Sequence, residues 1–331
     1  MDQLKFVVEA SEAESITQKL GLPSARHLLP ALVQPAQTLA RPPISNYHVA
    51  AVGLGSDGRV FLGVNLEFPG LPLHHSVHAE QFLLTNLAVH RCPRLLAFAV
   101  SAAPCGHCRQ FLQELRNPSD LQIHITSQHQ NNPDVTFEPL REILPNPFGP
   151  FDLLDDETPL LLELHNNGLS LSCEMNHDGD LCNGFSDDDS KIANGVSKSG
   201  NLSNGFYKIT ETESTLLRIA GLEAANNSHA PYSGCPSGVA IMDCEGKIYR
   251  GSYVESAAYN PSLGPVQGAL IAFVAGGGGG YERIVAAALV EKEGVKVRQE
   301  ETARIFLKLV SPKCDLKVFH CCVAENGCKK N

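Results

Sequence analysis

The sequence predicts an α/β chain of two layered domains, each a mixed sheet covered by helices. Three observations support this fold class. The chain has 331 residues, which is more than one hydrophobic core usually spans. Strand-like and helix-like segments alternate after an initial hairpin in the first half, and part of that pattern recurs in the second half.

Two helical segments are expected before the first sheet. Residues 11–20 form the first one, because Ser11 and Glu14 have the spacing of a capping box. A second helical segment follows, and we expect Pro30 and Pro35 to interrupt it, since proline removes a helix hydrogen bond.

The first sheet is predicted from residue 49 onward. Two strands flank Asp57 and Gly58, a dipeptide typical of a hairpin turn. Helices and strands then alternate. The expected segments are strands at 49–54 and 59–67, a helix at 77–90, a strand at 95–102, a helix at 105–116 and a strand at 121–126.

Five residues around the first hairpin recur 188 positions later. The pairs are Pro43 and Pro231, Ser45 and Ser233, Gly58 and Gly246, Gly63 and Gly251, and Glu67 and Glu255. Such a local repeat indicates a duplicated domain.

A polar segment separates the two halves. Between Asn166 and Asn204 the composition changes to Asn, Asp, Ser and Gly, which is typical of a flexible linker. We therefore expect a first domain at residues 1–150, a connector with a polar insertion at 151–205, and a second domain at 206–331.

The composition excludes several classes of protein. The formal net charge is −10 and no cluster of Lys or Arg is present, so we expect no nucleic-acid partner and favour a small substrate. The acidic amino terminus and the lack of any apolar run near the roughly 20 residues of a membrane helix argue against export and against a membrane partner. Eleven cysteines, an odd number, then indicate reduced thiols in a cytosolic protein.

The strongest functional signal is a set of three potential metal ligands. His78 begins one predicted helix, and Cys105 and Cys108 lie three residues apart at the start of another. Both sulfurs can therefore face one metal ion together with the histidine. Three ligands leave a fourth tetrahedral position for water, as in a catalytic zinc site rather than a closed structural one.

Glu80 lies two residues after the histidine and can reach a water on the metal without binding the metal itself. Two thiolates cancel the charge of Zn²⁺, which weakens its polarisation of a bound water. The positive ends of two helices offset this effect, because they favour the thiolate form and draw electron density from sulfur. His78 with Glu80 forms an H-x-E pattern, and residues 104–108 form a P-C-x-x-C pattern. Together they are the known signature of zinc-dependent nucleobase deaminases.

Other histidines and cysteines offer alternative interpretations. Cys92 could complete a closed structural zinc site, although the open ligand set with its adjacent acid favours a catalytic one. His74 and His75 fit an exposed loop, and His107 is expected to point away from the metal. Three cysteines near the carboxyl terminus, Cys321, Cys322 and Cys328, could bind a second metal. Free thiols are favoured there, because no histidine or acid has ligand spacing with these cysteines.

With these residues in place, the sequence resembles the cytidine deaminases, in particular the two-domain homodimeric branch found in plants and some bacteria. The resemblance covers nearly the whole chain. Its motifs are I-S-N-Y-H-V-A at 44–50, N-L-E-F at 65–68, V-H-A-E-Q at 77–81 and P-C-G-H-C-R-Q at 104–110. It implies the cytidine deaminase fold, a mixed sheet covered by helices, duplicated as a catalytic and a degenerate non-catalytic domain.

The resemblance also implies substrate-binding roles. Asn65 and Glu67 would bind a sugar hydroxyl, and the backbone of Ala79 and Ala103 would help to read the pyrimidine. Tyr47 stands where the family places an aromatic ring against the base, although phenylalanine is more usual there. Without the resemblance, a carboxylate and an amide at the end of a strand could equally satisfy a turn.

Phe148 stands between two prolines at the end of the first domain. The resemblance places an aromatic ring here into the active site of the neighbouring subunit, whereas the sequence alone would favour a ring anchored in its own domain. In the second half, residues 263–267 read Leu-Gly-Pro-Val-Gln where the first half has its ligand and acid. One zinc ion per chain is therefore expected, and the resemblance implies a homodimer.

The expected function is hydrolytic deamination of the nucleosides cytidine and deoxycytidine to uridine and deoxyuridine, with release of ammonia, as in pyrimidine salvage. Two alternatives remain. One is a deaminase of cytosine in nucleotides or polynucleotides, which the acidic balance disfavours. The other is a zinc-stabilised interaction protein without activity, which Glu80 beside the ligands disfavours.

Overall fold

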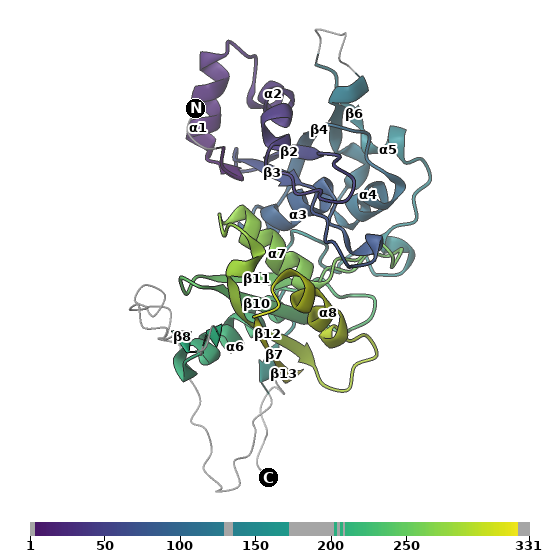
Figure 1. Ribbon diagram of the computed structural model, residues 1–331. Coiled ribbons are helices and arrows are strands. Elements are labelled where there is room, and N and C mark those ends of the chain that lie inside the picture. The colour runs from purple at the N-terminus through teal and green to yellow at the C-terminus, as the bar shows by residue number, and fades with distance from the viewer. Residues whose placement is uncertain (1–3, 129–134, 172–201, 204–205, 208, 324–331) are drawn as a thin grey trace, which may run out of the picture.

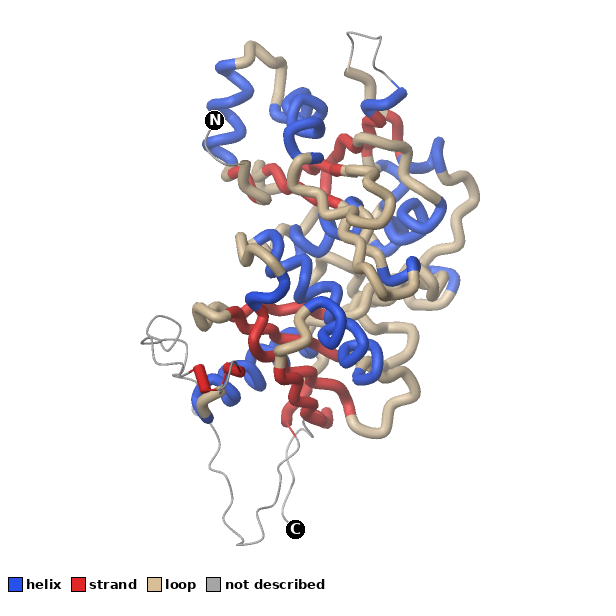
Figure 2. Tube along the Cα trace, viewed as in Figure 1, coloured by secondary structure: helices blue, strands red, loops and turns tan. Residues whose placement is uncertain are grey.

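Two sheets with helices packed on their faces form the architecture (Figures 1 and 2). The computed structural model describes residues 4–128, 135–171, 202–203, 206–207 and 209–323. No helix within these described residues combines the length and the apolar character that a membrane crossing requires.

The first sheet is built from the first half of the chain. Its strands are β1 (Val7–Val8), β2 (Ala50–Gly55), β3 (Val60–Val64), β4 (Leu95–Val100), β5 (Gln122–Ile125) and β6 (Glu138–Pro139), in the order β1-β3-β2-β4-β5-β6. Its helices are α1 (Ala10–Lys19), α2 (Ala25–Gln37), α3 (Ala79–Val89), α4 (Gly106–Phe111) and α5 (Leu140–Ile143). Short 3₁₀ turns lie at Leu73–His75, Leu112–Glu114, Pro118–Asp120, Thr126–Gln128 and Pro150–Asp152.

The second sheet follows the same plan. Its strands are β7 (Leu169–Leu171), β10 (Ser237–Asp243), β11 (Ile248–Ser252), β12 (Ile284–Lys292) and β13 (Asp315–Val323), in the order β11-β10-β12-β13-β7. Its helices are α6 (Glu211–Asn226), α7 (Pro265–Ala275) and α8 (Glu300–Val310), with a 3₁₀ turn at Tyr281–Arg283. A separate pair is formed by β8 (Leu202–Ser203) and β9 (Phe206–Tyr207).

The two sheets share one pattern of strand directions. β2 pairs antiparallel with β3 and β4, and β4 pairs parallel with β5. β10 pairs antiparallel with β11 and β12, and β12 pairs parallel with β13. This repeat confirms the predicted mixed α/β fold and its duplication.

The expected elements of the first half form, with two differences. α1 begins one residue early with Glu9 at its N-cap, so the predicted capping box of Ser11 is wrong. α2 continues through Pro30 and Pro35, so the predicted interruption is also wrong. Burial outweighs the proline penalty here, because α2 packs on β2. The buried residues of α2 are Leu28, Leu29, Val33 and Ala36.

The polar segment predicted from Asn166 to Asn204 contributes to the second sheet at its start. β7 lies within it and pairs antiparallel with β13, so that β7 forms one edge of the sheet. The amide of Asn167 donates to the carbonyl of Ser228 at 3.0 Å, which ties this stretch to the end of α6. Most of the remaining segment lies outside the described residues, and the proposed domain boundaries stay a prediction.

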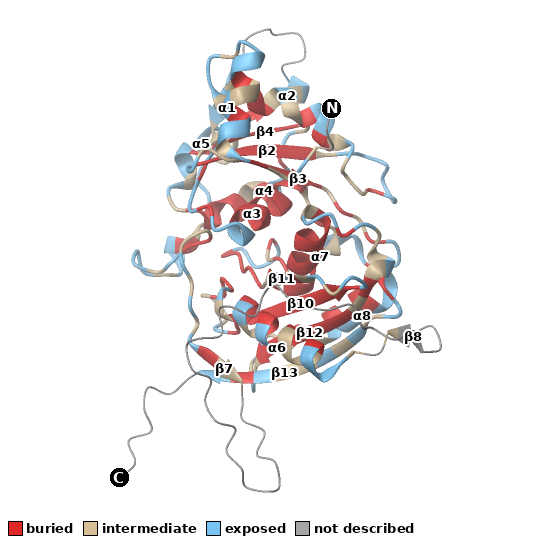
Figure 3. Cartoon of the chain, turned by 90° about the vertical axis from the view of Figure 1, so that its left-hand side faces the viewer, coloured by how far each residue is buried: buried red, intermediate tan, exposed pale blue. Residues whose placement is uncertain are grey.

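α3 and α7 lie between the two sheets and pack against each other (Figure 3). One hydrophobic core therefore runs through both halves, from Phe82 and Leu83 of α3 to Val266 and Leu270 of α7. The second half covers apolar surface that the first half would otherwise expose to water.

A glycine sets how closely α3 approaches its sheet. A Cβ atom on Gly63 in β3 would lie 2.2 Å from the carbonyl oxygen of Ala79 and 2.5 Å from the amide nitrogen of Leu83. Gly251 in β11 is equally close to α7, with the amide nitrogen of Ala269 at 1.9 Å. In both halves the helix backbone therefore rests directly on the strand.

We predict that Gly63→Ala destabilises the metal-free chain by about 1–3 kcal/mol or more, because the added methyl group must displace α3. Chemical denaturation of the full-length protein measures this change. Gly149→Ala is the matched control, since that position is extended and no atom lies within 4 Å of the added Cβ. Equal stability of the two variants would show that α3 does not depend on this approach.

Candidate metal centre and active site

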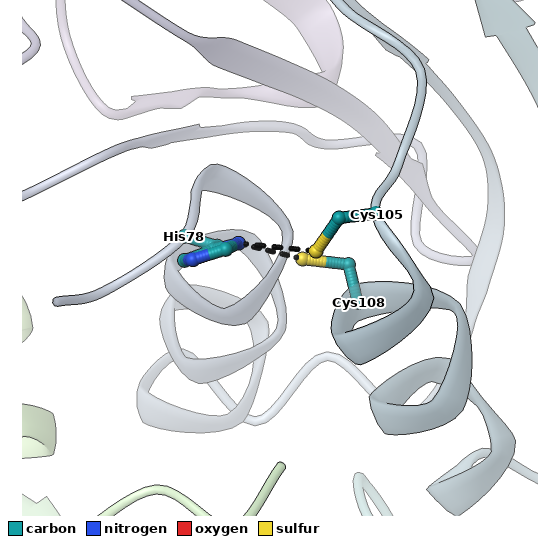
Figure 4. A group of neighbouring side chains, drawn as sticks. All are labelled: His78, Cys105 and Cys108. Carbon is teal, nitrogen blue, oxygen red and sulfur yellow. Dashed lines mark hydrogen bonds between the residues drawn. The ribbon is translucent and has the colours of Figure 1, made fainter. Parts of the chain in front are cut away.

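Two helix starts meet at the candidate metal centre. His78 is the N-cap of α3 and Cys105 is the N-cap of α4, and both have extended backbone conformations. Cys108 lies one turn into α4 and is buried. Figure 4 shows the three side chains pointing toward one another from the two helices.

The spacing of the three donor atoms suits a tetrahedral zinc ion. Nδ1 of His78 lies 3.5 Å from Sγ of Cys105 and 3.3 Å from Sγ of Cys108. Usual Zn–S and Zn–N bond lengths in a tetrahedral site would place sulfur and nitrogen about 3.6 Å apart. One nitrogen and two sulfurs form a donor set typical of zinc. Three protein ligands leave a fourth position free.

The two sulfurs have opposite protonation tendencies in the absence of metal. Hydrogen bonds from Cys108 and His78 lower the pKa of Cys105 to about 3. The same bond to Cys105, together with burial, raises the pKa of Cys108 above its usual value. Cys105 therefore loses its proton more readily than Cys108, and a metal ion that binds both sulfurs must compete with the proton of Cys108.

Glu80 lies in the first turn of α3 and is 4% exposed. Its Oε2 accepts a hydrogen bond from Sγ of Cys108 at 3.2 Å, so the carboxylate lies beside one of the three candidate donors. It is not a member of the group of three donors found among the described residues. Burial raises the pKa of Glu80 above its usual value. A carboxyl group with a raised pKa beside a metal can both accept and release a proton near neutral pH.

Asn65 and Glu67 hold the loop that follows α2. Oε2 of Glu67 accepts from the amides of Ile44 and Ser45 at 2.9 Å each, and Oε1 accepts from the Ser45 hydroxyl at 2.6 Å. Burial opposes ionisation of Glu67, but the Ser45 and Ile44 donors lower its pKa below the usual value.

The amide of Asn65 bonds on both sides of the same loop. Its Oδ1 accepts from the amide of Val49 and its Nδ2 donates to the carbonyl of Tyr47, both at 2.9 Å. One amide hydrogen and one carboxylate lone pair, on Asn65 and Glu67, remain for another partner. Both side chains thus satisfy the loop and keep capacity for a ligand.

The remaining predicted site residues differ in exposure. Ala79 is buried in the first turn of α3, where backbone N–H groups have no partner within the helix. Ala103 is exposed between β4 and α4. Tyr47 is 60% exposed and Phe148 is 46% exposed, so neither ring fills the core of its own domain. The carbonyl of Phe148 accepts from the Gln110 side chain on α4 at 2.5 Å, which ties this loop to the metal-binding helix.

The alternative ligands do not join the site. Among the described residues, the group that could hold a metal contains His78, Cys105 and Cys108 and no other histidine or cysteine. His75 packs edge-on against Phe306, and the Cys92 thiol bonds the carbonyl of Arg94. Cys321 and Cys322 lie in β13, and Cys328 lies outside the described residues.

His107 lies near the ligands without being one of them. Its ring stacks on that of His78 with centroids 5.2 Å apart. Its Nε2 lies 3.1 Å from Nε2 of Gln81. Sequence reasoning missed Gln81, although a glutamine three residues after an N-cap is a known capping signal.

Comparisons with known proteins agree with this site. A family model described as the cytidine and deoxycytidylate deaminase zinc-binding region matches residues 24–124, and a second model of the same description matches residues 140–304. Cytidine deaminase 1 of Arabidopsis thaliana is 53% identical over 328 residues, covering 97% of this chain and 99% of the relative. Cytidine deaminase 7 of the same plant is 46% identical, covering 97% and 96%. The crystal structure of cytidine deaminase from Mycobacterium tuberculosis is 32% identical, with 38% of this chain and 97% of that chain covered and a TM-score of 0.32.

We expect the purified chain to hold one zinc ion, and Cys105→Ala to lose it, because two protein ligands hold the metal far more weakly than three. Elemental analysis after extensive dialysis measures the ratio. Cys92→Ala is the control and should keep its zinc, since Cys92 is buried away from the donors. A ratio near two, or loss of zinc from the Cys92 variant, would contradict this ligand set.

Proposed function

The chain belongs to the cytidine and deoxycytidylate deaminase family, and we propose that it converts cytidine and deoxycytidine to uridine and deoxyuridine with release of ammonia. The observation that carries the proposal is a buried carboxylate, Glu80, 3.2 Å from one sulfur of an open three-donor metal set. In this reaction water adds at C4 of the pyrimidine and the bond from C4 to the exocyclic nitrogen breaks.

His78, Cys105 and Cys108 are the proposed zinc ligands. Bound zinc would supply a Lewis acid that lowers the pKa of the attacking water. Glu80 accepts a proton from that water and delivers it to N3 of the ring. It then accepts the second proton from the oxygen now bonded to C4 and delivers that proton to the departing amine. Burial raises the pKa of Glu80 above its usual value, which favours the protonated form that donates to the substrate.

The proposal also assigns contacts to the nucleoside. Asn65 and Glu67 bind a sugar hydroxyl with the hydrogen-bonding capacity that the loop leaves unused. The backbone of Ala79 and Ala103 reads the pyrimidine edge, and the exposed ring of Tyr47 packs against the base. Stacking of a base on an aromatic ring contributes about 1–3 kcal/mol in other systems.

The contacts of the second half support the proposal of one substrate site per chain. Glu255 there repeats the loop bonds of Glu67, because it accepts from the amides of Tyr232 and Ser233 at 2.9 and 3.1 Å. The fully buried carboxylate of Glu114, from the first half, lies beside the loop that Glu255 holds. It accepts from the Tyr232 hydroxyl at 2.6 Å and from the amide of Ala257 at 2.7 Å.

A homodimer is also part of the proposal. Several large apolar side chains of the first half are exposed, and a second copy would cover them. Among them are Tyr47, Leu73, Phe148, Phe151 and Leu153. A cytosolic role in pyrimidine salvage fits a small nucleoside substrate. It also fits a sequence with a formal net charge of −10 and no cluster of Lys or Arg.

A substrate panel tests the function. We expect ammonia release from cytidine and deoxycytidine, and little from deoxycytidine monophosphate or a cytosine-containing oligonucleotide, because the net charge of −10 repels polyanions. Preference for the nucleotide or the oligonucleotide would support the first rival function. Zinc-loaded protein inactive on all four would support the interaction-protein rival.

We predict that Glu80→Ala keeps one zinc ion per chain but lowers turnover by at least about 10²–10⁴-fold, the usual range for loss of a general acid–base. Elemental analysis and the cytidine assay on the same sample measure both quantities. Zinc loss in this variant would make Glu80 a ligand and overturn its assignment as the proton carrier.

Mixed dimers test whether Phe148 acts on the neighbouring subunit. A heterodimer of Glu80→Ala with Phe148→Ala contains one complete site if Phe148 acts across the dimer, and none if it acts within its own chain. We expect the mixed dimer to exceed the Phe148→Ala parent in activity per intact Glu80. Activity no higher than that parent would place the ring in its own subunit.

A further inference from the structure

Gln81 contacts both halves of the chain and both metal-binding helices. It is the third residue of α3 and is 2% exposed. Its Oε1 accepts from the backbone amide of His78 at 3.2 Å. Its Nε2 donates to the carbonyl of Pro261, in the second half, at 3.1 Å and lies 3.1 Å from Nε2 of His107. All the hydrogen-bonding groups of this side chain therefore have partners.

The bond to His107 connects Gln81 to the second ligand-bearing helix. His107 lies between Cys105 and Cys108, and its ring stacks on the ring of His78 with an interplanar angle of 16°. Fixing His107 therefore limits the motion of the α4 turn that carries both sulfurs. It also limits the rotation of the histidine ligand beneath it.

Gln267 makes the corresponding bonds from the other side. It is the third residue of α7, its Oε1 accepts from the amide of Gly264 at 3.0 Å, and its Nε2 donates to the carbonyl of His75 at 2.9 Å. The offset between Gln81 and Gln267 is 186, and the offset between their acceptors His75 and Pro261 is also 186. The two glutamines thus form a reciprocal pair across the contact between α3 and α7.

The two members of the pair differ in what else they hold. Gln267 caps a helix whose first residues are Pro265 and Val266, where no metal ligand is present. Gln81 caps the helix whose N-cap is His78. The duplication therefore supplies an internal comparison, with the same cross-domain bond present once beside the ligands and once apart from them.

We propose that Gln81 is a positioning residue through which the second half of the chain sets the geometry of the zinc site. The carbonyl of Pro261 holds the Gln81 amide, which in turn holds the start of α3 and the ring of His107. A domain whose described residues form no metal-binding group of their own thereby contributes to metal affinity. The inference rests on the zinc site of the proposed function.

The test compares Gln81→Met with Gln267→Met in the full-length chain. Methionine has a similar length and removes the amide group in each case. Competition with a chromogenic chelator measures the Zn²⁺ dissociation constant, the absorption spectrum after Co²⁺ substitution reports ligand geometry, and thermal unfolding of the metal-free protein reports domain contact.

We expect Gln81→Met to weaken Zn²⁺ binding by about 10–100-fold, the range found when partners of metal ligands are removed. Its Co²⁺ spectrum should change as well. Gln267→Met should lower the unfolding temperature of the metal-free protein to a similar extent and keep the wild-type affinity and spectrum.

Wild-type Zn²⁺ affinity and a wild-type Co²⁺ spectrum in Gln81→Met would overturn the inference. Equal weakening of Zn²⁺ binding in the two variants would also overturn it, since contact between the domains would then be sufficient to explain the effect. If Gln81→Met does not fold, His107→Phe keeps a stacked ring but removes the acceptor for Gln81. Weaker zinc binding there supports the link, and unchanged binding rejects it. A wild-type chain that binds no Zn²⁺ would instead reject the proposed function.

Discussion

The meeting of two helix N-termini is the constraint on which the rest of the structure depends. His78 and Cys105 are both N-caps, and their helices start beside each other because each follows a strand of the same sheet. At Gly63 the backbone of α3 rests directly on β3, which leaves no room for a side chain. The positive ends of the helix dipoles then converge where the two sulfurs lie, which favours the thiolates that a metal ion binds. The position of the three donor atoms thus depends on how α3 and α4 pack on the first sheet.

The duplicated second half repeats the scaffold, and its described residues contain no group that could hold a metal ion. Its sheet repeats the strand order of the first, and Glu255 repeats the loop bonds of Glu67. The carboxylate of Glu114, which follows the metal-binding helix α4, reaches across the interface to the Tyr232 hydroxyl and to Nε2 of His229. A buried carboxylate requires such partners, because an unpaired charge in the interior is costly. The second half therefore contacts the first half both at α3, through Gln81, and at the turn after α4, through Glu114.

Much of this arrangement could be predicted from the sequence, because short-range patterns encode it. The hairpin at Asp57, the alternation of strands and helices, and the H-x-E and P-C-x-x-C patterns are all local. The predicted break in α2 failed because burial of its apolar face outweighs the cost of two prolines. The role of Gln81 and the reach of Glu114 could not be predicted, since each depends on residues more than a hundred positions away. Contacts between domains leave no periodic signal in a single sequence.

The proposed chemistry requires an open zinc site with one histidine and two cysteine ligands. X-ray absorption at the zinc edge of the full-length protein measures this ligand set, because sulfur and lighter neighbours scatter differently and lie at different distances, about 2.3 Å for sulfur and about 2.0–2.1 Å for nitrogen. We expect two sulfur and two lighter neighbours around each zinc ion, the second lighter one from solvent. Three or four sulfur neighbours would mean a closed structural site completed by another cysteine, and would rule out this ligand set.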